Sequence, residues 1–217
     1  MPSGNSPLLI QCDFDGTVTL DDISFLILDR CADGHWRNLL EKYKAGEISV
    51  GAFNRQAFLM VKDDEPSLKR LVREGFKIRP GFGGFVRYCA ANRHRLVIVS
   101  NGLDFYINTI LEAIGVSGID VFAAKTRFGG DGIEASYLGP DGRELDDCFK
   151  ETYSRMFLER GNRLVYIGNG PSDFPPAKLA QAVFATEQLC EHCKQAGVKH
   201  TPFTNFDEVI EGLKRLS

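Results

Sequence analysis

Several features that would place this chain in a special class of protein are missing from it. No apolar run approaches the ~20 residues of a membrane-spanning helix, and 26 basic residues nearly balance 29 acidic ones, for a formal net charge of −3. This balance gives no electrostatic reason to expect binding to nucleic acid or to a membrane surface. Met1–Pro7 lacks the basic and apolar regions of a secretion signal. We therefore expect a short flexible lead-in and a cytoplasmic location, with neither nucleic acid nor membrane as a partner.

The cysteines of this chain do not have the spacing of a metal site or a disulfide framework. The 6 cysteines are predicted to be free thiols, because a chain of this size without a secretion signal rarely depends on disulfide bonds. Cys190 and Cys193 have C-x-x-C spacing. A zinc site needs two further ligands, and the candidates His200 and Cys148 form no second spaced pair. We therefore disfavour metal or redox chemistry at this motif.

The sequence does contain an alternation of buried strands and helices. Short apolar runs are typical of parallel strands that are buried on both faces. We predict such strands at 8–12, 96–100, 121–124, 164–168 and 182–185. Helical patterns of apolar residues lie between and after them, at 104–114, 149–158, 172–181, 187–196 and 207–216. Strands that alternate with helices predict an α/β fold with a doubly wound parallel sheet.

About sixty residues after the first strand contain no clear strand pattern. Residues 21–80 instead show helical patterns at 23–31, 36–45, 50–61 and 67–74. We predict a helical cap domain at 21–80, inserted into a core formed by 1–20 and 81–217. A cap at this position lies over the strand ends and excludes water when it closes. Two glycine-rich turns around 133–138 also predict a β-hairpin off the main sheet.

The strongest functional signal is Asp13-Phe14-Asp15-Gly16-Thr17 at the end of the first predicted strand. Side chains alternate along a strand, so Asp13 and Asp15 begin on the same side. Open α/β sheets bind ligands at the carboxyl ends of their strands. Of two carboxylates placed there, one can act as a nucleophile and the other can transfer a proton, and together they can bind Mg²⁺. An Asp-rich surface turn is the alternative, but the preceding apolar strand and the Gly-Thr-x-Thr tail favour a functional site.

Polar residues also mark three other predicted elements. Ser100–Gly102 ends a strand and offers a hydroxyl and backbone N–H groups to a phosphoryl oxygen, although the same triplet is an ordinary turn elsewhere. Asn169 lies in a Gly-x-Gly loop after another strand, and Asp173 follows at a helix start. There the Asp173 carboxylate either faces a cation or interacts with the helix dipole. Lys150 is either a solvated group or a source of positive charge in a phosphate site.

These motifs, in this order, resemble those of the haloacid dehalogenase superfamily of phosphatases with an aspartate nucleophile. The matching elements are Asp13–Thr17, Ser100–Gly102, Lys150 and Gly168–Asp173. The helical insertion resembles the cap of the phosphoserine-phosphatase-like subgroup, on a Rossmann-like core. More specifically, the chain resembles the methionine-salvage phosphatases of 2-hydroxy-3-keto-5-methylthiopentenyl-1-phosphate. That likeness covers most of the chain and includes Lys77–Phe82, Val99–Phe105, Cys148–Lys150, Ala177–Leu179 and His200–Phe203.

The resemblance implies phosphoryl transfer in two steps. Asp13 would attack phosphorus to form an aspartyl-phosphate, and Asp15 would protonate the leaving alcohol and then activate water. Lys150 would complete the catalytic set by binding phosphoryl oxygens. Mg²⁺ would be the cofactor, with ligands from Asp13, Asp15, Asn169 and Asp173. The phosphate ester would be bound by Thr17, Asp22, Ser100, Asn101 and Gly102.

Two departures from the family pattern affect these expectations. The last motif usually begins Gly-Asp, whereas this chain has Gly168-Asn169, so we predict weaker metal binding or a larger share of ligation by Asp173. Asp22 replaces a glutamate of phosphoserine phosphatases and Ala57 replaces their cap arginine, which disfavours phosphoserine. We therefore expect a Mg²⁺-dependent phosphomonoesterase for a small metabolite, as a monomer or homodimer. The alternatives are a phosphatase for another small ester, phosphoserine included, and an impaired phosphate-binding regulatory protein.

Overall fold

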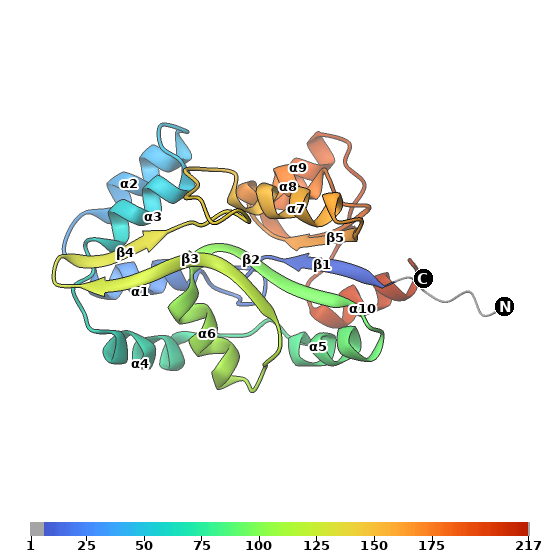
Figure 1. Cartoon of the computed structure of the whole chain (residues 1–217), viewed down its shortest axis with the longest axis horizontal. Coiled ribbons are helices and arrows are strands. Elements are labelled where there is room, and N and C mark those ends of the chain that lie inside the picture. Colours follow the sequence, from blue (N-terminus) through green and yellow to red (C-terminus); the bar gives the residue numbers. More distant parts are fainter. Residues whose placement is uncertain (1–6, 217) are drawn as a thin grey trace.

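A seven-stranded sheet forms the centre of the computed structural model, which describes residues 7–216 (Figure 1). The strands follow the order β4-β3-β2-β1-β5-β6-β7, and every neighbouring pair is parallel except β3 and β4. Their bounds are β1 Leu8–Cys12, β2 Arg95–Leu103, β3 Asp120–Gly129, β4 Gly132–Ser136, β5 Arg163–Gly168, β6 Ala182–Ala185 and β7 Thr201–Pro202. The predicted doubly wound α/β fold is confirmed. Most of the predicted lead-in, 1–6, lies outside the described residues.

Strand β1 occupies the middle of the sheet, with a hydrogen-bonded neighbour on each side. Ile10 pairs with Leu96 of β2 and with Val165 of β5. All five residues of β1 are buried, which explains the continuous apolar run in the sequence. The chain continues from β1 to β2, β3 and β4 on one side and then crosses to β5 on the other side of β1. The carboxyl end of β1 is therefore a topological switch point, where ligands bind in folds of this type.

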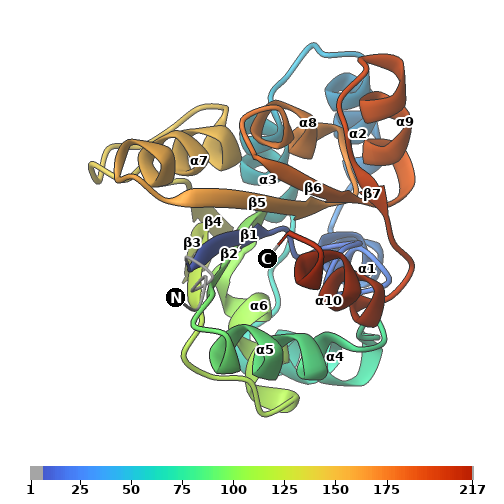
Figure 2. The same ribbon diagram turned by 90° about the vertical axis from the view of Figure 1, so that its right-hand side faces the viewer.

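Helices cover both faces of the sheet (Figure 2). One face carries α5 Phe82–Ala91, α6 Asp104–Ala113 and α10 Phe206–Lys214. The other carries α7 Phe149–Glu159, α8 Phe174–Ala177 and α9 Glu187–Gln195, with the 3₁₀ turn η1 Pro171–Asp173 before α8. None of the helices in the described part of the chain has the length and apolarity that crossing a bilayer demands. All 6 cysteines are free thiols, as predicted.

The segment between β1 and α5 contains four helices, α1 Ile23–Cys31, α2 Trp36–Lys44, α3 Val50–Phe58 and α4 Glu65–Gly75. It leaves and returns at one place, where Thr19 and Ile78 form an antiparallel bridge. Helices α2 and α3 pack together and α3 contacts β4, whereas α4 contacts α6 below the sheet in Figure 1. The helices of this segment are therefore divided between two sides of the sheet. The boundaries of a separate cap domain at 21–80 stay a prediction.

Two local predictions need correction. The hairpin expected off the main sheet is part of it, because β3 pairs first with β2 and then, from Lys125 onward, with β4. The helix expected at 172–181 is reduced to η1 and α8. After α8 the chain returns to the sheet, where the Gln181 N–H donates to the Leu164 carbonyl, and this contact ends the helical segment early.

Candidate functional site

A cavity of about 670 Å³ opens at the carboxyl end of β1. The insertion forms one wall and the loops after β1, β2 and β5 form the floor. The predicted site residues that line it are Asp13, Asp15, Asp22, Ser100, Asn101, Gly102, Lys150 and Asn169. The two others, Thr17 and Asp173, are buried directly behind this lining and contact it through hydrogen bonds. The structure therefore brings all the predicted residues to one place.

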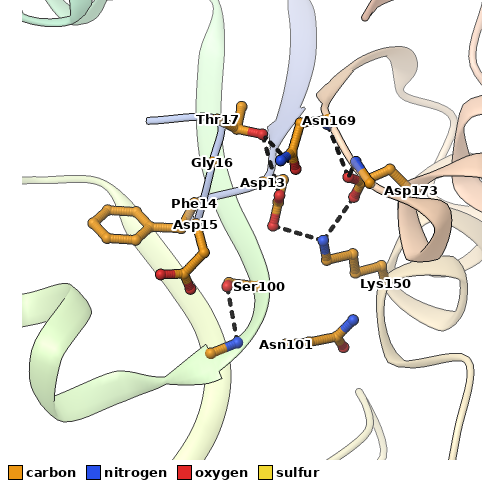
Figure 3. A network of polar contacts seen from close by, with 12 residues as sticks. Asp13, Phe14, Asp15, Gly16, Thr17, Ser100, Asn101, Lys150, Asn169 and Asp173 are labelled. Carbon is orange, nitrogen blue, oxygen red and sulfur yellow. Dashed lines mark hydrogen bonds and ion pairs between the residues drawn. The ribbon is translucent and has the colours of Figure 1, made fainter. Parts of the chain in front are cut away.

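Lys150 connects two carboxylates on the floor of the cavity (Figure 3). Its Nζ lies 2.6 Å from Oδ1 of Asp13 and 2.6 Å from Oδ1 of Asp173, and all three side chains are buried. Burial by itself would lower the pKa of Lys150, but the two carboxylates outweigh it and raise that pKa above its usual range. Lys150 is therefore a cation next to the predicted nucleophile.

Asp173 is oriented by four donors and has no free oxygen. Its Oδ1 accepts from Lys150 and, at 2.6 Å, from the Tyr166 hydroxyl. Its Oδ2 accepts from the backbone N–H groups of Asn169 at 3.0 Å and Gly170 at 2.8 Å. A carboxylate engaged in this way positions Lys150 and the 168–173 loop. The share of metal ligation expected for Asp173 stays a prediction.

Negative charge in the cavity exceeds positive charge. Burial, with the nearby charge of Asp173, raises the pKa of Asp13 to about 7 despite Lys150. Burial and the charge of Asp22 raise the pKa of Asp15 to about 7. Asp22 follows the same trend, with a pKa of about 6 caused mainly by burial. One buried lysine thus faces several carboxylates, and an added cation would stabilise their ionised forms.

Asp15 is held by groups from two helices. Its Oδ1 accepts from the Ile23 N–H at 2.9 Å, and its Oδ2 accepts from the Tyr106 hydroxyl at 2.6 Å. The Tyr106 hydroxyl also lies 2.9 Å from that of Ser24. Tyr106 was not predicted as a site residue, because its place on the buried face of α6 identifies it only as part of the core. Asp22 caps α1 by accepting from the Phe25 N–H at 3.1 Å.

The Ser100–Gly102 segment, predicted to follow its strand as a turn, lies within the last part of β2 and is fixed by contacts from Asn54 of the insertion and from Tyr137. Ser100 Oγ accepts from the Gly102 N–H at 3.0 Å. The Asn101 carbonyl accepts from Asn54 Nδ2 of α3 at 2.8 Å and also from the Tyr137 hydroxyl. Neither partner carries a sequence motif that would reveal this role. These bonds leave the Ser100 hydroxyl and this segment facing the cavity.

The residues that could hold a cation offer oxygen atoms. Asp13 Oδ2 and Asn169 Oδ1 lie 3.1 Å and 3.3 Å from the same atom, Thr17 Oγ1. Within residues 7–216, no three His, Cys, Asp or Glu side chains gather as a ready-made metal cage. Mg²⁺ does not need one, because it prefers a few oxygen ligands and keeps several waters. The donors present, together with the uncompensated negative charge, therefore fit Mg²⁺.

The wall formed by the insertion combines apolar and polar side chains. The apolar and aromatic ones are Phe25, Leu40, Tyr43, Val50 and Phe53, and the polar ones are Asp22, Ser24, Lys44 and Asn54. Arg55, the arginine near the position of the cap arginine in phosphoserine phosphatases, forms ion pairs with Glu144 and Asp146 instead of lining the cavity. The apolar side chains of this wall therefore suit an uncharged part of a substrate, and Arg55 is not placed to bind an amino-acid carboxylate.

Comparison with known proteins agrees with this geometry. The model of the haloacid dehalogenase-like hydrolase family matches residues 10–178. A 2-hydroxy-3-keto-5-methylthiopentenyl-1-phosphate phosphatase of Bacillus velezensis is 30% identical over 97% of this chain and 91% of its own length. The enzyme of that name from Geobacillus kaustophilus is 29% identical over 96% of each chain. Among solved structures, a substrate-bound phosphoserine phosphatase shares the fold, with a TM-score of 0.72 and 15% identity over 95% of this chain and 98% of its own.

Proposed function

Because this chain belongs to the haloacid dehalogenase-like hydrolase family and is a phosphatase, we propose that it hydrolyses a small phosphate monoester through an aspartyl-phosphate on Asp13. The observation that carries this proposal is the buried Asp13–Lys150–Asp173 array, with Asp15 facing the same cavity. It places a nucleophile, a cation and a second carboxylate around one space. This is the set of groups that nucleophilic phosphoryl transfer requires.

In the first step, a carboxylate oxygen of Asp13 forms a bond to phosphorus while the bond from phosphorus to the alcohol oxygen breaks. Asp15 gives its proton to the departing oxygen, and its pKa of about 7 leaves part of the population protonated near neutral pH. In the second step, Asp15 takes a proton from water as that water attacks phosphorus. The bond to Asp13 breaks, and inorganic phosphate leaves.

Two groups of this chain are proposed to bind the phosphoryl oxygens. Lys150 supplies positive charge at the floor, and Ser100 supplies its hydroxyl from the end of β2. Asp13, the Asp15 carbonyl and Asn169 would hold Mg²⁺, which would supply further positive charge to offset that of the phosphoryl group. Asp173 orients Lys150 and is left out of this ligand set.

The proposed substrate is 2-hydroxy-3-keto-5-methylthiopentenyl-1-phosphate, the ester in the names of the two relatives. Its methylthio end is apolar, and the wall built by Phe25, Leu40, Val50 and Phe53 offers a matching surface. Phosphoserine carries a charged amino-acid group instead. With Arg55 paired to Glu144 and Asp146, phosphoserine finds no arginine of the insertion facing the cavity.

The proposal is tested with purified protein, first on p-nitrophenyl phosphate with Mg²⁺ or with EDTA. We expect activity that EDTA removes, and a loss of at least about 10³-fold in Asp13→Asn. Asp131→Asn, in an exposed turn, is the matched control and keeps full activity. Comparison of kcat/KM for the methylthiopentenyl ester and phosphoserine then tests the substrate. Unchanged turnover in Asp13→Asn would refute the nucleophile, and a preference for phosphoserine would refute the substrate assignment.

A further inference from the structure

The side-chain amide of Asn169 is bound at both ends. Its Nδ2 donates to Oε2 of Glu187 at 3.2 Å, and its Oδ1 accepts from the Thr17 hydroxyl at 3.3 Å. The Thr17 hydroxyl is also 3.1 Å from Asp13 Oδ2, as the adjoining contacts in Figure 3 show. The amide oxygen therefore shares the Thr17 hydroxyl with Asp13 Oδ2, and the amide nitrogen contacts Glu187.

We propose that Glu187 is a positioning residue for the cation site: it holds Asn169 with its oxygen toward Asp13 and supplies beside the site a negative charge that Asn169 lacks. This inference rests on the Mg²⁺ site of the proposed function. It concerns how an asparagine serves where the family usually has an aspartate.

The chemistry of an amide explains why such a partner is needed. A carboxylate presents an oxygen in either of its flipped orientations, whereas an amide presents an oxygen in one and two N–H donors in the other. Without a partner for its nitrogen, Asn169 would be more stable with its N–H groups turned toward the negatively charged Asp13 carboxylate. That orientation would place donors where a cation needs oxygen. An acceptor on the far side of Asn169 prevents this flip.

Glu187 is itself attached to the loop that carries the nucleophile. Its Oε1 lies 3.8 Å from a terminal nitrogen of Arg79. The same buried guanidinium donates to the Gly16 carbonyl at 2.6 Å and to the Thr17 carbonyl at 2.8 Å. The contacts from Asp13 through Thr17, Asn169, Glu187 and Arg79 therefore return to the backbone of Thr17 and close a ring.

The backbone also fixes the position of Glu187 relative to Asn169. Glu187 has φ +48°, in the left-handed region that residues other than glycine seldom adopt. Two backbone hydrogen bonds hold it there, from Leu189 N–H to the Asn169 carbonyl at 2.7 Å and from Thr186 N–H to the Gly168 carbonyl at 3.1 Å. The start of α9 is thus fastened to the Asn169 loop.

Close packing limits the freedom of the amide as well. A Cβ at Gly16 would lie 2.1 Å from Asn169 Nδ2. Gly16 therefore gives the amide the space that it occupies beside the nucleophile loop. Glu187 then decides which end of the amide points away from Asp13.

The test is a double-mutant cycle on Mg²⁺ affinity, measured by isothermal titration calorimetry on metal-free protein. The variants are Glu187→Gln, which keeps an acceptor without the charge, Glu187→Leu, which removes both, Asn169→Asp, and Asn169→Asp with Glu187→Leu. We expect Glu187→Leu to weaken Mg²⁺ binding about 10- to 100-fold, as loss of a partner behind a metal ligand does. Glu187→Gln should weaken it less. In the Asn169→Asp variant, removal of Glu187 should lower the Mg²⁺ affinity by less than about threefold, because a carboxylate at position 169 needs no orienting partner.

The control is Glu191→Gln, which removes the same charge from an exposed pair with Lys194 on α9 and should leave the affinity unchanged. The Glu187 side chain is 52% exposed, so its variants are expected to fold, and thermal unfolding checks this. Wild-type affinity retained in Glu187→Leu would overturn the inference, and so would equal losses on removal of Glu187 from the wild type and from Asn169→Asp. Absence of Mg²⁺ binding in the wild type would instead refute the metal site of the proposed function.

Discussion

The ammonium group of Lys150 lies 2.6 Å from Oδ1 of Asp13, and both side chains are buried. A buried carboxylate without such a partner would lose its charge, and with it its strength as a nucleophile. Asp173 holds the same lysine from the other side at 2.6 Å. The three residues therefore act as one unit, and the four predictions that follow begin with it.

Replacement of Lys150 by methionine should destabilise and inactivate the protein together. Methionine keeps the length of the side chain but leaves two buried carboxylates unpaired, so we expect the free energy of unfolding to fall by about 3–5 kcal/mol. Activity should fall at least about 10²-fold. Urea unfolding and p-nitrophenyl phosphate hydrolysis measure the two effects. The control is Lys194→Met, which breaks an exposed ion pair and should lower the free energy of unfolding by less than about 1 kcal/mol. Equal stability of the two variants would show that Lys150 does not stabilise the two buried carboxylates.

The stability of the metal-free protein should carry a pH-dependent contribution from Asp13. Its pKa is raised from an ordinary 3.8 to about 7 in the folded protein, mainly by burial. The protonated carboxyl is therefore favoured by folding. The contribution is complete below the ordinary pKa and is lost as the pH rises through about 7.

Asp13→Asn isolates this contribution because an amide does not ionise. Relative to the wild type, the free energy of unfolding of the variant should rise by about 2–4 kcal/mol as the pH increases across that window. Urea unfolding in EDTA at a series of pH values measures the difference. Mg²⁺ should reduce it by stabilising the ionised carboxylate of the wild type. Parallel stability curves for the two proteins would show that the pKa of Asp13 is not raised.

Tyr106→Phe should lower kcat by about tenfold with little change in KM. The substitution removes the 2.6 Å hydrogen bond to Asp15 Oδ2 and the contact with Ser24, so the acid–base carboxylate loses one of its orienting partners. Steady-state kinetics with a fixed substrate measure the effect. Tyr88→Phe, on α5 away from the cavity, is the control. A kcat equal to that of the control would remove Tyr106 from the site.

Gly102→Ala should also disturb the hydrogen-bonded pair of Asp15 and Tyr106, because the new methyl group enters the space that they occupy. An added Cβ would lie 1.8 Å from the Tyr106 hydroxyl and 2.6 Å from Asp15 Oδ2, so both side chains or the backbone of Gly102 must move. We expect a loss of about 1–3 kcal/mol in stability and a marked loss of activity. Gly130→Ala is the control, since a Cβ there meets nothing within 4 Å. Thermal unfolding and hydrolysis assays compare them, and similar behaviour of both variants would contradict the close approach.

The central strands could be predicted because burial on both faces makes them apolar throughout. The first strand was predicted at 8–12 and β1 is Leu8–Cys12, and the strand predicted at 182–185 is also confirmed. Strand β3 runs to Gly129, well past the predicted 121–124, because its second half is at an edge and carries exposed residues such as Lys125. Helix α5 was not predicted, because Gly83 and Gly84 near its start have low helix propensity and interrupt its apolar pattern.

In the site, too, residues that share one short segment could be predicted, whereas residues that tertiary packing brings in could not. Asp13 and Asp15 were found because both come from one short segment whose spacing carries the chemistry. Tyr106 and Glu187 were not found, since each contacts a predicted site residue only because a helix far along the chain packs there. Asp173 was placed at the site, but its partners decide its function. No pattern near Asp173 shows that four donors would surround its carboxylate.

The position of β1 in the sheet also has a consequence during protein synthesis. The strand that delivers Asp13 is synthesised before the other strands of the sheet, yet Ile10 pairs with Leu96 and Val165. Strand pairs that are far apart in the sequence form late in folding, because the entropy of closing the long loop between them is lost before their contacts can stabilise the pair. Until β5 has emerged, the nascent chain has no central strand in place and Lys150 has no fixed position beside the aspartate. The catalytic arrangement of Asp13 and Lys150 therefore forms only after most of the chain has been synthesised.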